Sequence, residues 1–497
     1  MKIRLSTLVL LGASTVSSAF AQSYKTDIPS SIVTPNSLET RLGTLKFTDG
    51  FPDDATVQKV YDNLDFQRGV QAFLTAMPAA SLSAIRKGIS EFGPANQTVA
   101  LFENLMDARS LFLTGNSENI YGWAWIDLKD GPIVIESAPN SLSIVDDFWF
   151  RYVGDLGNAG PDKGKGGKYL VLPPGYEGPV PDGYFVLKSP TFNNVFITRG
   201  FQVDGDPKPG VENIKQHLRI YPLAQAANPP TTTFVNVSGK SFNTTHALDI
   251  TYFDEVNEVV QEEPSAAMDP ETLGLLASIG IEKGKPFAPD ERMKKILTES
   301  AAVGSATART LTFRMRNKDS YFYPDSAWGT PFIGGSHRFE HDGIRLLDAR
   351  TYFYFYATGN TPAMTAKMVG VGSQYATAFV DANKQPFDGA KTYRLHLPPN
   401  IPAKNFWSVV LYDNQTRSML QTDQQFPSIG SQRKGIVMNP DTSVDLYFGP
   451  KAPPGKESNW VQTTPGKGWN TLLRLYGPLE PWFNKTWRPG EIEEVKP

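Results

Sequence analysis

The HRFEH string at residues 337–341 has the H-x-x-E-H spacing of one class of zinc peptidases. That chemistry requires a helix, where residues four positions apart lie about 5–6 Å from each other and can bind one ion. Gly335 and Gly343 bracket the string, so a stable helix is not expected there. In an extended segment rising about 3.3 Å per residue, His337 and His341 would lie about 13 Å apart, too far for a shared zinc ion. We therefore predict no shared metal ion and no helical zinc peptidase.

A second candidate site lies in the segment that begins near Arg345, which is predicted to be a strand. Alternation along a strand puts Leu347, Ala349, Phe353 and Phe355 on one face, which is a core face. The opposite face combines a carboxylate, a guanidinium and three phenols, which can hydrogen-bond a ligand and also present flat apolar surface. These residues are Asp348, Arg350, Tyr352, Tyr354 and Tyr356.

Another predicted strand carries Arg394 and His396 on one face and Tyr393, Leu395 and Leu397 on the other. If the polar faces of the two strands meet, they form the wall of a cleft. The candidate catalytic residues are then Asp348 and His396, and the candidate substrate-binding residues are Arg350, Tyr352, Tyr354, Tyr356 and Arg394. The alternative is that the tyrosines pack between domains, that Asp348 pairs with Arg350, and that His396 is a structural histidine.

Other motifs for catalysis are incomplete. The glycine-rich stretch 154–167 is not a phosphate loop, because no Ser or Thr follows Lys165 or Lys168. The G-x-S-x-G nucleophile elbow is absent, so a serine hydrolase of that type is not expected. The chain contains no cysteine, which excludes thiolate nucleophiles and cysteine-ligated metals. No metal and no other cofactor is predicted.

The first residues have the organisation of a secretory signal peptide. Two cations precede an apolar run from Leu5 to Val16, and Ala19-Phe20-Ala21 follows as a small-x-small cleavage site. The apolar run is shorter than the about 20 residues that cross a bilayer, and no later segment approaches that length without charge. We expect a mature protein that starts near Gln22, is periplasmic or secreted, and has no membrane span.

The charge and the aromatic content of the chain indicate which classes of partner to expect. The formal net charge is −3 and Lys and Arg are scattered along the chain, so nucleic acid is not an expected partner. Aromatic residues make up 12% of the chain, with nine tryptophans, which is typical of β-rich domains. Such rings also lie against sugars and other flat ligands.

The periodicity of the chain predicts an α+β protein, mainly β with a helical insertion. Helices are expected from the N-cap Asp54, over 81–92, and from the N-caps Asp269 and Asp290. Short strands are expected around 121–126, 133–135, 148–153, 169–172, 184–187, 195–202, 352–357, 393–397, 406–412, 444–448 and 472–476.

These elements divide the chain into two antiparallel β-sandwich or jelly-roll-like modules separated by helices. The predicted parts are a signal peptide at 1–21, an N-terminal helical lead-in at 22–100, an N-terminal β domain at 101–206, a helical insertion at 207–310 and a C-terminal β domain at 311–497.

Several long strings resemble a bacterial protein family. They are GNTPAM from Gly359, GVGSQY from Gly370, LPPNIPAKNFWSVVLYDNQTRSML from Leu397, FGPKAPPGKESNW from Phe448, RLYGPLEPWFNKTW from Arg474, YGWAWIDLKDGPIVIESAP from Tyr121 and GKYLVLPPGY from Gly167. Together they resemble the family that pairs an N-terminal domain of unknown function 1254 with a C-terminal domain of unknown function 1214. One departure is Asp441-Thr442-Ser443, where the family usually has Asp-Gly-Ser.

The resemblance covers nearly the whole mature chain and implies two β-rich modules with a helical middle, and export in many members. It implies no activity and no functional residue. The residues themselves favour an exported protein that binds a small molecule or glycan in an aromatic and polar cleft, and a hydrolase or lyase if it is an enzyme. The alternative is a non-catalytic envelope or stress-related protein that binds a partner through a flat aromatic patch.

Overall fold

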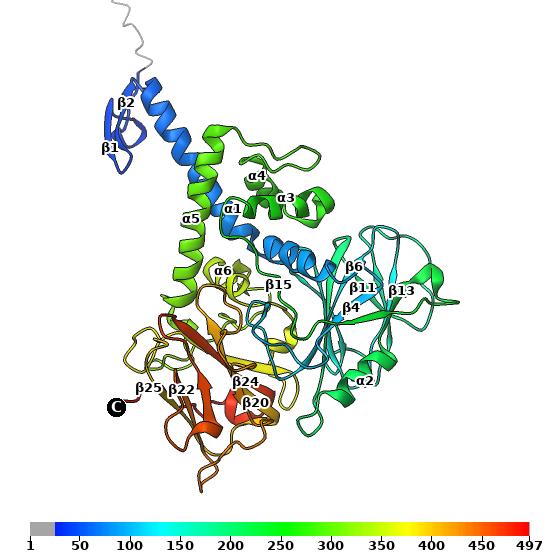
Figure 1. Cartoon of the computed structure of the whole chain (residues 1–497). Coiled ribbons are helices and arrows are strands. Elements are labelled where there is room, and N and C mark those ends of the chain that lie inside the picture. Colours follow the sequence, from blue (N-terminus) through cyan, green and yellow to red (C-terminus); the bar gives the residue numbers. More distant parts are fainter. Residues whose placement is uncertain (1–24, 497) are drawn as a thin grey trace, which may run out of the picture. The chain divides into compact units, whose positions relative to one another are not determined.

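The computed structural model describes residues 25–496, and the expected signal peptide lies outside the described residues (Figure 1). The chain separates into two compact units, one up to Asn63 and one from Leu64 onward. The described part of the first unit contains a small antiparallel sheet and the first turns of α1 (Asp54–Ser90). The strands of this sheet are β1 (Ser37–Thr40), β2 (Gly43–Thr48) and β3 (Phe51–Pro52).

Helix α1 is one continuous element where two helices were predicted. The side chain of Asp53 accepts a hydrogen bond from the Thr56 amide at 2.8 Å. The N-cap is therefore Asp53, one residue before the expected Asp54. Between the two predicted segments the helix continues through Pro78, and many of its small and apolar residues there are fully buried. Burial in the core stabilises the helix where the sequence pattern alone suggested a break.

The N-terminal β domain contains two larger sheets that share a core. The six-stranded sheet has the order β14 (Thr233–Asn236), β4 (Thr98–Leu101), β6 (Ile120–Asp127), β12 (Asn193–Gly200), β8 (Leu142–Asp147) and β9 (Tyr152–Gly157). The four-stranded sheet has the order β11 (Phe185–Lys188), β10 (Lys168–Leu172), β7 (Ile133–Glu136) and β13 (Arg219–Pro222). Apolar residues of β4, β6, β7, β10 and β12 form the core between them.

The strand predicted at 148–153 was wrong over residues 148–151, and its last two residues begin β9. Residues 148–151 connect β8 to β9, and Phe150 has φ 58°. The Phe150 amide donates to the carbonyl of Asp147 at 2.8 Å, which closes a tight turn. The aromatic residues of this turn are buried, so their hydrophobicity reflects core packing and not a strand.

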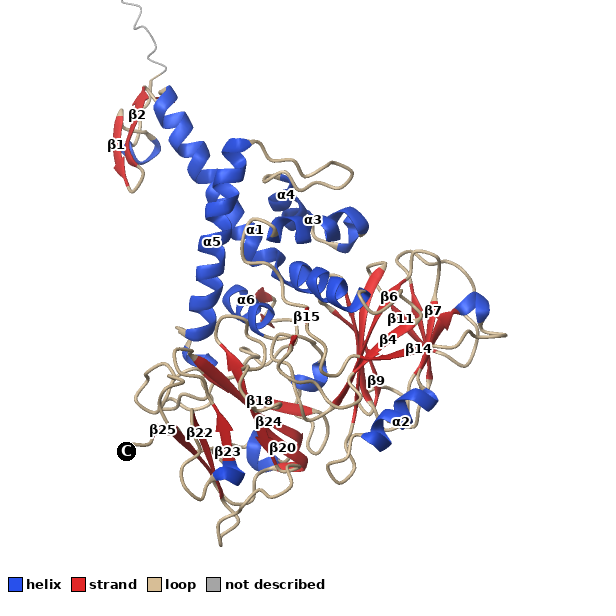
Figure 2. Cartoon of the chain, in the orientation of Figure 1, coloured by secondary structure: helices blue, strands red, loops and turns tan. Residues whose placement is uncertain are grey.

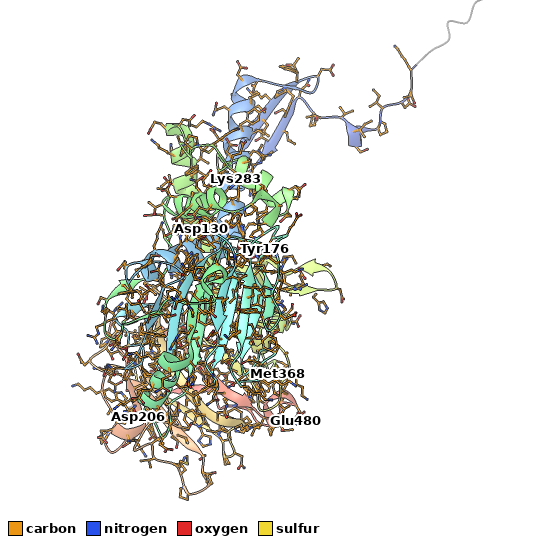
Figure 3. The ribbon with its side chains drawn as sticks, turned by 90° about the vertical axis from the view of Figure 1, so that its right-hand side faces the viewer. Asp130, Tyr176, Asp206, Lys283, Met368 and Glu480 are labelled. Atoms are coloured by element: carbon orange, nitrogen blue, oxygen red, sulfur yellow. The ribbon has the colours of Figure 1, made fainter. Side chains whose placement is uncertain are left out.

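The middle of the chain contains helices and also strands that complete the N-terminal sheets. The helices are α2 (Lys208–His217), α3 (Tyr252–Glu262), α4 (Pro270–Ala277) and α5 (Glu291–Phe313). Strands β13 and β14 come from this region, as does β15 (Phe242–Asn243), which pairs with β5 (Ser110–Leu111). The predicted N-caps are confirmed, because Asp269 accepts from the Thr272 amide and Asp290 from the Met293 amide. In Figure 3, Lys283 after α4 lies at the opposite end of this unit from Asp206.

The C-terminal region contains two four-stranded sheets, as its alternating pattern predicted. One has the order β18 (Ser373–Ala378), β24 (Trp469–Pro478), β20 (Ala403–Asp413) and β21 (Ser428–Gly430). The other has the order β23 (Trp460–Gln462), β22 (Val444–Gly449), β19 (Tyr393–Leu397) and β25 (Ile492–Glu494). Their facing sides form a second core that includes Trp328 and Trp469. The short helix α7 (Glu480–Phe483) follows β24.

The segment predicted as a strand over 352–357 is instead the helix α6 (Leu347–Tyr356). Every residue from Thr351 to Tyr356 is buried, so the helix has no polar face in that stretch. A helix that is apolar all round gives no amphipathic signal, and a run of aromatic residues is then easily read as a strand. Helix α6 packs against α5 inside the central core.

The H-x-x-E-H string is not helical, as predicted. His337 and Arg338 lie in a turn, and the last two residues of the string form β16 (Glu340–His341), which pairs with β17 (Ile344–Arg345). Phe339 has φ 53°, which a helix does not allow.

The fold class is confirmed as α+β with a majority of antiparallel strand pairs, although β10–β11, β4–β14, β5–β15 and β22–β23 are parallel. Within the unit from Leu64 onward, Figure 2 shows most of the strands in two groups. Within residues 25–496, none of the helices combines the length and the hydropathy needed to span a membrane. The boundaries between the five predicted parts stay predictions.

Candidate functional site

A cavity of about 60 Å³ lies between the six-stranded N-terminal sheet and the C-terminal sheet that contains β24. We refer to it as the intersheet cavity. Its walls carry side chains of β6, β8 and β12 on one side and of β18 and β24 on the other, with the end of α6 and the loop after it between them. It adjoins the central core, which is continuous across both β regions.

The N-terminal wall follows from the register of the sheet. Tyr121 on β6 is directly opposite Arg199 on β12, and Trp123 is directly opposite Ile197. Residues directly opposite each other in an antiparallel pair project from the same face. All four side chains line the cavity, together with Ile144 of β8. An arginine thus lies at the end of a row of aromatic and aliphatic residues on a face that is otherwise core.

The C-terminal wall repeats this arrangement. Arg474 on β24 is directly opposite Tyr375 on β18, and both line the cavity with Leu472. The alternate residues of β24, Leu473 and Leu475, project into the second core on the other side of the sheet. Each β region therefore contributes one arginine to the same cavity.

Both guanidinium groups are buried without a carboxylate partner. Arg199 is 3% exposed and Arg474 is 4% exposed. Among the described residues, neither forms an ion pair with an acidic side chain. Arg474 donates to the Tyr412 hydroxyl and to the Thr114 carbonyl at 2.7 Å. The Arg199 guanidinium has the Tyr375 hydroxyl as its hydrogen-bond partner.

The groups that compensate these charges are phenols and not carboxylates. Burial opposes the charge of both guanidiniums, while the surrounding tyrosines hold the pKa of each arginine above its ordinary value. Burial also raises the pKa of Tyr412 and Tyr476, so these phenols are neutral near pH 7 and act through their dipoles. An isolated buried cation is strongly unfavourable, which makes this cavity an environment for an anion.

Two further polar groups at the cavity have no partner among the described residues. The indole Nε1–H of Trp123, a residue 2% exposed, is one, and the buried hydroxyl of Thr358 is the other. A tryptophan N–H can only donate a hydrogen bond. The cavity therefore offers more donors than acceptors, as an anion site requires.

The backbone beside Arg474 is in an uncommon conformation. Thr114 has φ 46°, which is unfavourable for a β-branched residue. Its amide donates to the carbonyl of Arg417 at 2.8 Å, and its carbonyl accepts from Arg474. Strained backbone of this kind is held by its surroundings and gathers at binding and catalytic sites.

The acidic groups nearest to Arg199 lie on the same sheet but do not touch it. The two carboxylate oxygens of Asp155 lie 2.7 and 2.8 Å from the Thr361 hydroxyl, which donates to them. Asp146 accepts a hydrogen bond from the main-chain amide of Asn360 at 3.1 Å. Burial raises the pKa of Asp155 to about 6 and also raises that of Asp146 well above its ordinary value, although the positive charge of Arg199 lowers both. These contacts tie the loop after α6 to β8 and β9.

The residues predicted from the supposed strand are dispersed by the helix. Tyr356 lines the intersheet cavity and donates to Asn470 Oδ1 at 2.5 Å. Tyr352 is buried beside Thr377. Tyr354 and Arg350 line a different hollow, described below. The premise that these side chains share one strand face was wrong, because α6 turns about 100° per residue.

The charged residues of the predicted site do not meet. Asp348 is bound by Arg316 and not by Arg350, so the expected pair is absent. Arg394 pairs with Glu493, and His396 Nδ1 lies 2.9 Å from Asp445 Oδ1. Neither Arg394 nor His396 has a partner on α6 among the described residues, and neither lines the intersheet cavity. Their roles as site residues stay predictions without a shared site.

The sequence contained a signal for the two arginines that were not singled out. Alternation within the strands expected at 195–202 and 472–476 puts Arg199 with Val195 and Ile197, and Arg474 with Leu472 and Tyr476. A single arginine on an apolar strand face is unusual, because arginine is almost never buried without a partner. That each strand would contribute to the same cavity depends on the packing of two sheets, which alternation does not reveal.

Comparisons with known proteins support the architecture. The model of DUF1254, a protein of unknown function, matches residues 96–222, and that of DUF1214, also of unknown function, matches residues 372–480. Both arginines lie inside these matches, one in each. No curated protein matches the chain.

Two solved structures are similar to this chain. The VPA0106 protein from Vibrio parahaemolyticus has 18% sequence identity and a TM-score of 0.54, and the alignment covers 87% of this chain and 100% of that one. This likeness supports the fold alone. A putative uncharacterized protein from Burkholderia cenocepacia has 12% identity and a TM-score of 0.37, over 88% of this chain and 96% of that one.

Proposed function

We propose that this chain, which pairs a DUF1254 domain with a DUF1214 domain, binds a small carboxylate between the two. The observation that carries the proposal is the pair Arg199 and Arg474, one from each domain, buried without an acidic partner at one cavity. Planar guanidiniums bind carboxylates through two parallel hydrogen bonds, and such charge-assisted bonds are among the strongest in proteins.

The lining of the cavity favours a carboxylate that carries a short hydrocarbon chain. Besides the arginines, the walls consist mostly of aromatic and aliphatic side chains, such as Phe112, Trp123 and Leu472. The volume of about 60 Å³ holds about four water molecules and is smaller than the engineered cavity of about 150 Å³ that accepts benzene. A linear acid of about two to four carbons therefore fits better than an aromatic acid.

The same lining favours binding over acid–base catalysis. Among the described residues that line the cavity there is no Asp, Glu, His or Lys. Carboxyls and imidazoles are the most common general acids and bases of enzymes. We therefore assign the cavity a binding role, and the hydrolase and lyase readings gain no support from it. If the signal peptide expected at residues 1–21 is cleaved, the ligand is met outside the cytoplasm.

Calorimetric titration of the mature protein with acetate, propionate, butyrate, benzoate, phosphate and sulfate tests this function. Chloride is adjusted to keep the ionic strength constant, because exposed charges bind anions weakly and non-specifically. We expect propionate or butyrate to bind with a Kd of about 10 µM to 1 mM, which is within the efficiency limit for a ligand of this size. Equal weak heats for all anions would contradict the proposal.

The affinity should depend on the anion's shape as well as its charge. Phosphate and sulfate carry more charge than propionate, but they have no apolar part to place against Phe112 and Leu472. Benzoate has the carboxylate, but its ring needs more volume than the cavity provides. We therefore expect propionate or butyrate to bind more tightly than phosphate, sulfate or benzoate. Tightest binding of phosphate would show that the site selects charge density and would overturn the assignment to a carboxylate.

A further inference from the structure

A second and larger hollow of about 670 Å³ opens beside α6, and it shares no lining residue with the intersheet cavity. We refer to it as the α6 cleft. It is lined by residues of the β8–β9 connection, the loop at 337–340 and α6, among them Trp149, Tyr152, His337, Arg350, Tyr354 and Asn360. Its size is within the range of about 300–1,000 Å³ that is usual for small-molecule sites.

At Arg350 the cleft contains a positive charge that no carboxylate pairs with among the described residues. Arg151 is paired with Asp147, and Arg345 is paired with Glu340. Arg350 donates to the Thr75 carbonyl at 2.8 Å and lies 5.7 Å from the Tyr354 ring, but it has no acidic partner among the described residues. Burial lowers the pKa of Arg350, and the charges of Arg345 and Arg151 lower it further. A negative group placed beside Arg350 would relieve both effects.

The cleft also offers a donor and an acceptor that are unused. The indole Nε1–H of Trp149 and the amide Oδ1 of Asn360 have no hydrogen-bond partner among the described residues. The two side chains are 3% and 1% exposed, so burial deprives these atoms of water. Unsatisfied buried polar groups cost about 1–3 kcal/mol each, and a ligand that pairs with them recovers this energy. A hydroxyl group both donates and accepts hydrogen bonds, so a ligand with several hydroxyls can serve this donor and this acceptor together.

Aromatic rings complete the lining. The half-buried rings of Tyr152 and His337 pack edge to face at 5.7 Å between centroids and line the cleft. Flat aromatic surfaces suit the apolar faces of sugar rings.

We propose that the α6 cleft binds an acidic sugar, with the carboxylate of a uronic acid at Arg350 and its hydroxyls at Trp149 and Asn360. The carboxylate would pair with the guanidinium that has no acidic partner, and the hydroxyls would hydrogen-bond the unpaired donor and acceptor. The apolar faces of the sugar ring would lie against the aromatic lining. The volume accommodates more than one sugar unit, so a short uronic-acid oligomer is the expected ligand. This site is independent of the function proposed for the intersheet cavity.

Titration of the mature protein with digalacturonate, and with the neutral galactose disaccharide of the same linkage, tests this assignment. The acidic sugar should bind at least tenfold more tightly than the neutral one. Arg350→Gln should remove that preference, whereas Arg488→Gln, which loses an arginine that is paired with Asp325 and Glu491 and lines neither cavity, should keep it. Absence of digalacturonate binding to the wild type, or equal affinity for both sugars, would overturn the proposal.

A second variant covers the outcome in which Arg350→Gln does not fold. Trp149→Phe keeps most of the buried ring and removes only the unpaired N–H. We expect it to lower the affinity for digalacturonate about three- to tenfold with little change in thermal midpoint. Unchanged affinity in a folded Trp149→Phe protein would contradict the assignment. A loss of digalacturonate binding in Arg199→Met would also contradict it, because Arg199 lines the other cavity.

Discussion

At the scale of single residues, Arg199 and Arg474 differ in how much of their binding capacity the protein itself uses. Arg474 has a phenol and a main-chain carbonyl as partners, whereas Arg199 has one phenol. Replacing a buried charged group by an apolar one of similar shape is often neutral or stabilising, unless a hydrogen-bond partner is left unsatisfied. The two arginines should therefore respond differently to the same substitution.

We expect Arg199→Met to change the free energy of unfolding of the ligand-free protein by less than about 1 kcal/mol, because the buried charge and its hydrogen bond to a phenol are removed together. Arg474→Met should lower it by about 1–3 kcal/mol, because the Thr114 carbonyl and the Tyr412 hydroxyl lose their donor. Urea denaturation of the ligand-free proteins measures both. If Arg199→Met is the more destabilised variant, Arg199 is a structural residue.

The pH dependence of the free energy of unfolding should show the contribution of the buried carboxyl of Asp155. Its pKa is raised to about 6 by burial, while the hydroxyls of Thr361 and Tyr152 and the charge of Arg199 lower it in part. Since the folded pKa lies above the unfolded value near 3.9, this carboxyl stabilises the fold fully below about pH 4 and loses that contribution as the pH rises through 6. A shift of about two units corresponds to about 3 kcal/mol.

Asp155→Asn imitates the protonated carboxyl. We expect it to raise the unfolding free energy by on the order of 1–3 kcal/mol at pH 7.5 and to change it little at pH 4. Asp254→Asn, at an exposed position of α3, is the matched control. Denaturation curves at both pH values check the difference, and destabilisation of Asp155→Asn at pH 7.5 would show that the hydrogen bonds to the charged form outweigh its burial.

At the scale of elements, α6 shows where sequence periodicity failed. Residues Thr351 to Tyr356 are all buried, so the segment has no periodic polar face. A strand buried on both faces and a helix buried on all sides would have the same kind of sequence. The segment forms a helix because it packs against α5 in the central core. This tertiary contact cannot be inferred from the local sequence. Strands β12 and β24 are also buried on both faces, each face against a different core, and they were predicted because short apolar runs bounded by turn residues are typical of strands.

Tyr354 on this helix is a core residue, and its truncation should be costly. The side chain is 4% exposed, its hydroxyl donates to the Phe150 carbonyl at 2.9 Å, and its ring contacts Phe339. We expect Tyr354→Ala to lower the free energy of unfolding by about 3–5 kcal/mol. Tyr61, 58% exposed on α1, is the control, and Tyr61→Ala should cost less than about 0.5 kcal/mol. Retention of wild-type stability by Tyr354→Ala would mean that the ring is solvent-accessible.

At the scale of the whole molecule, alternation and turn residues predicted the fold class and most strands, and the long strings predicted the pairing of the two domains, which the family models confirm. The site was not predicted, because its two arginines are 275 residues apart and meet only when two sheets pack face to face. The predicted cleft relied on one strand and on a meeting of polar faces. The first is a helix, and the second does not occur.

The central claim is that Arg199 and Arg474 together hold a small carboxylate, and titration of propionate into the wild type, Arg199→Met and Arg488→Gln tests it most directly. The wild type and Arg488→Gln, which loses an arginine paired with Asp325 and Glu491, should bind propionate with the same Kd. Arg199→Met should bind at least tenfold more weakly while remaining folded, which corresponds to a loss of about 1.4 kcal/mol. Equal propionate binding by the wild type and Arg199→Met, or none by either, would contradict the claim and leave the two arginines as parts of a structural contact between the sheets.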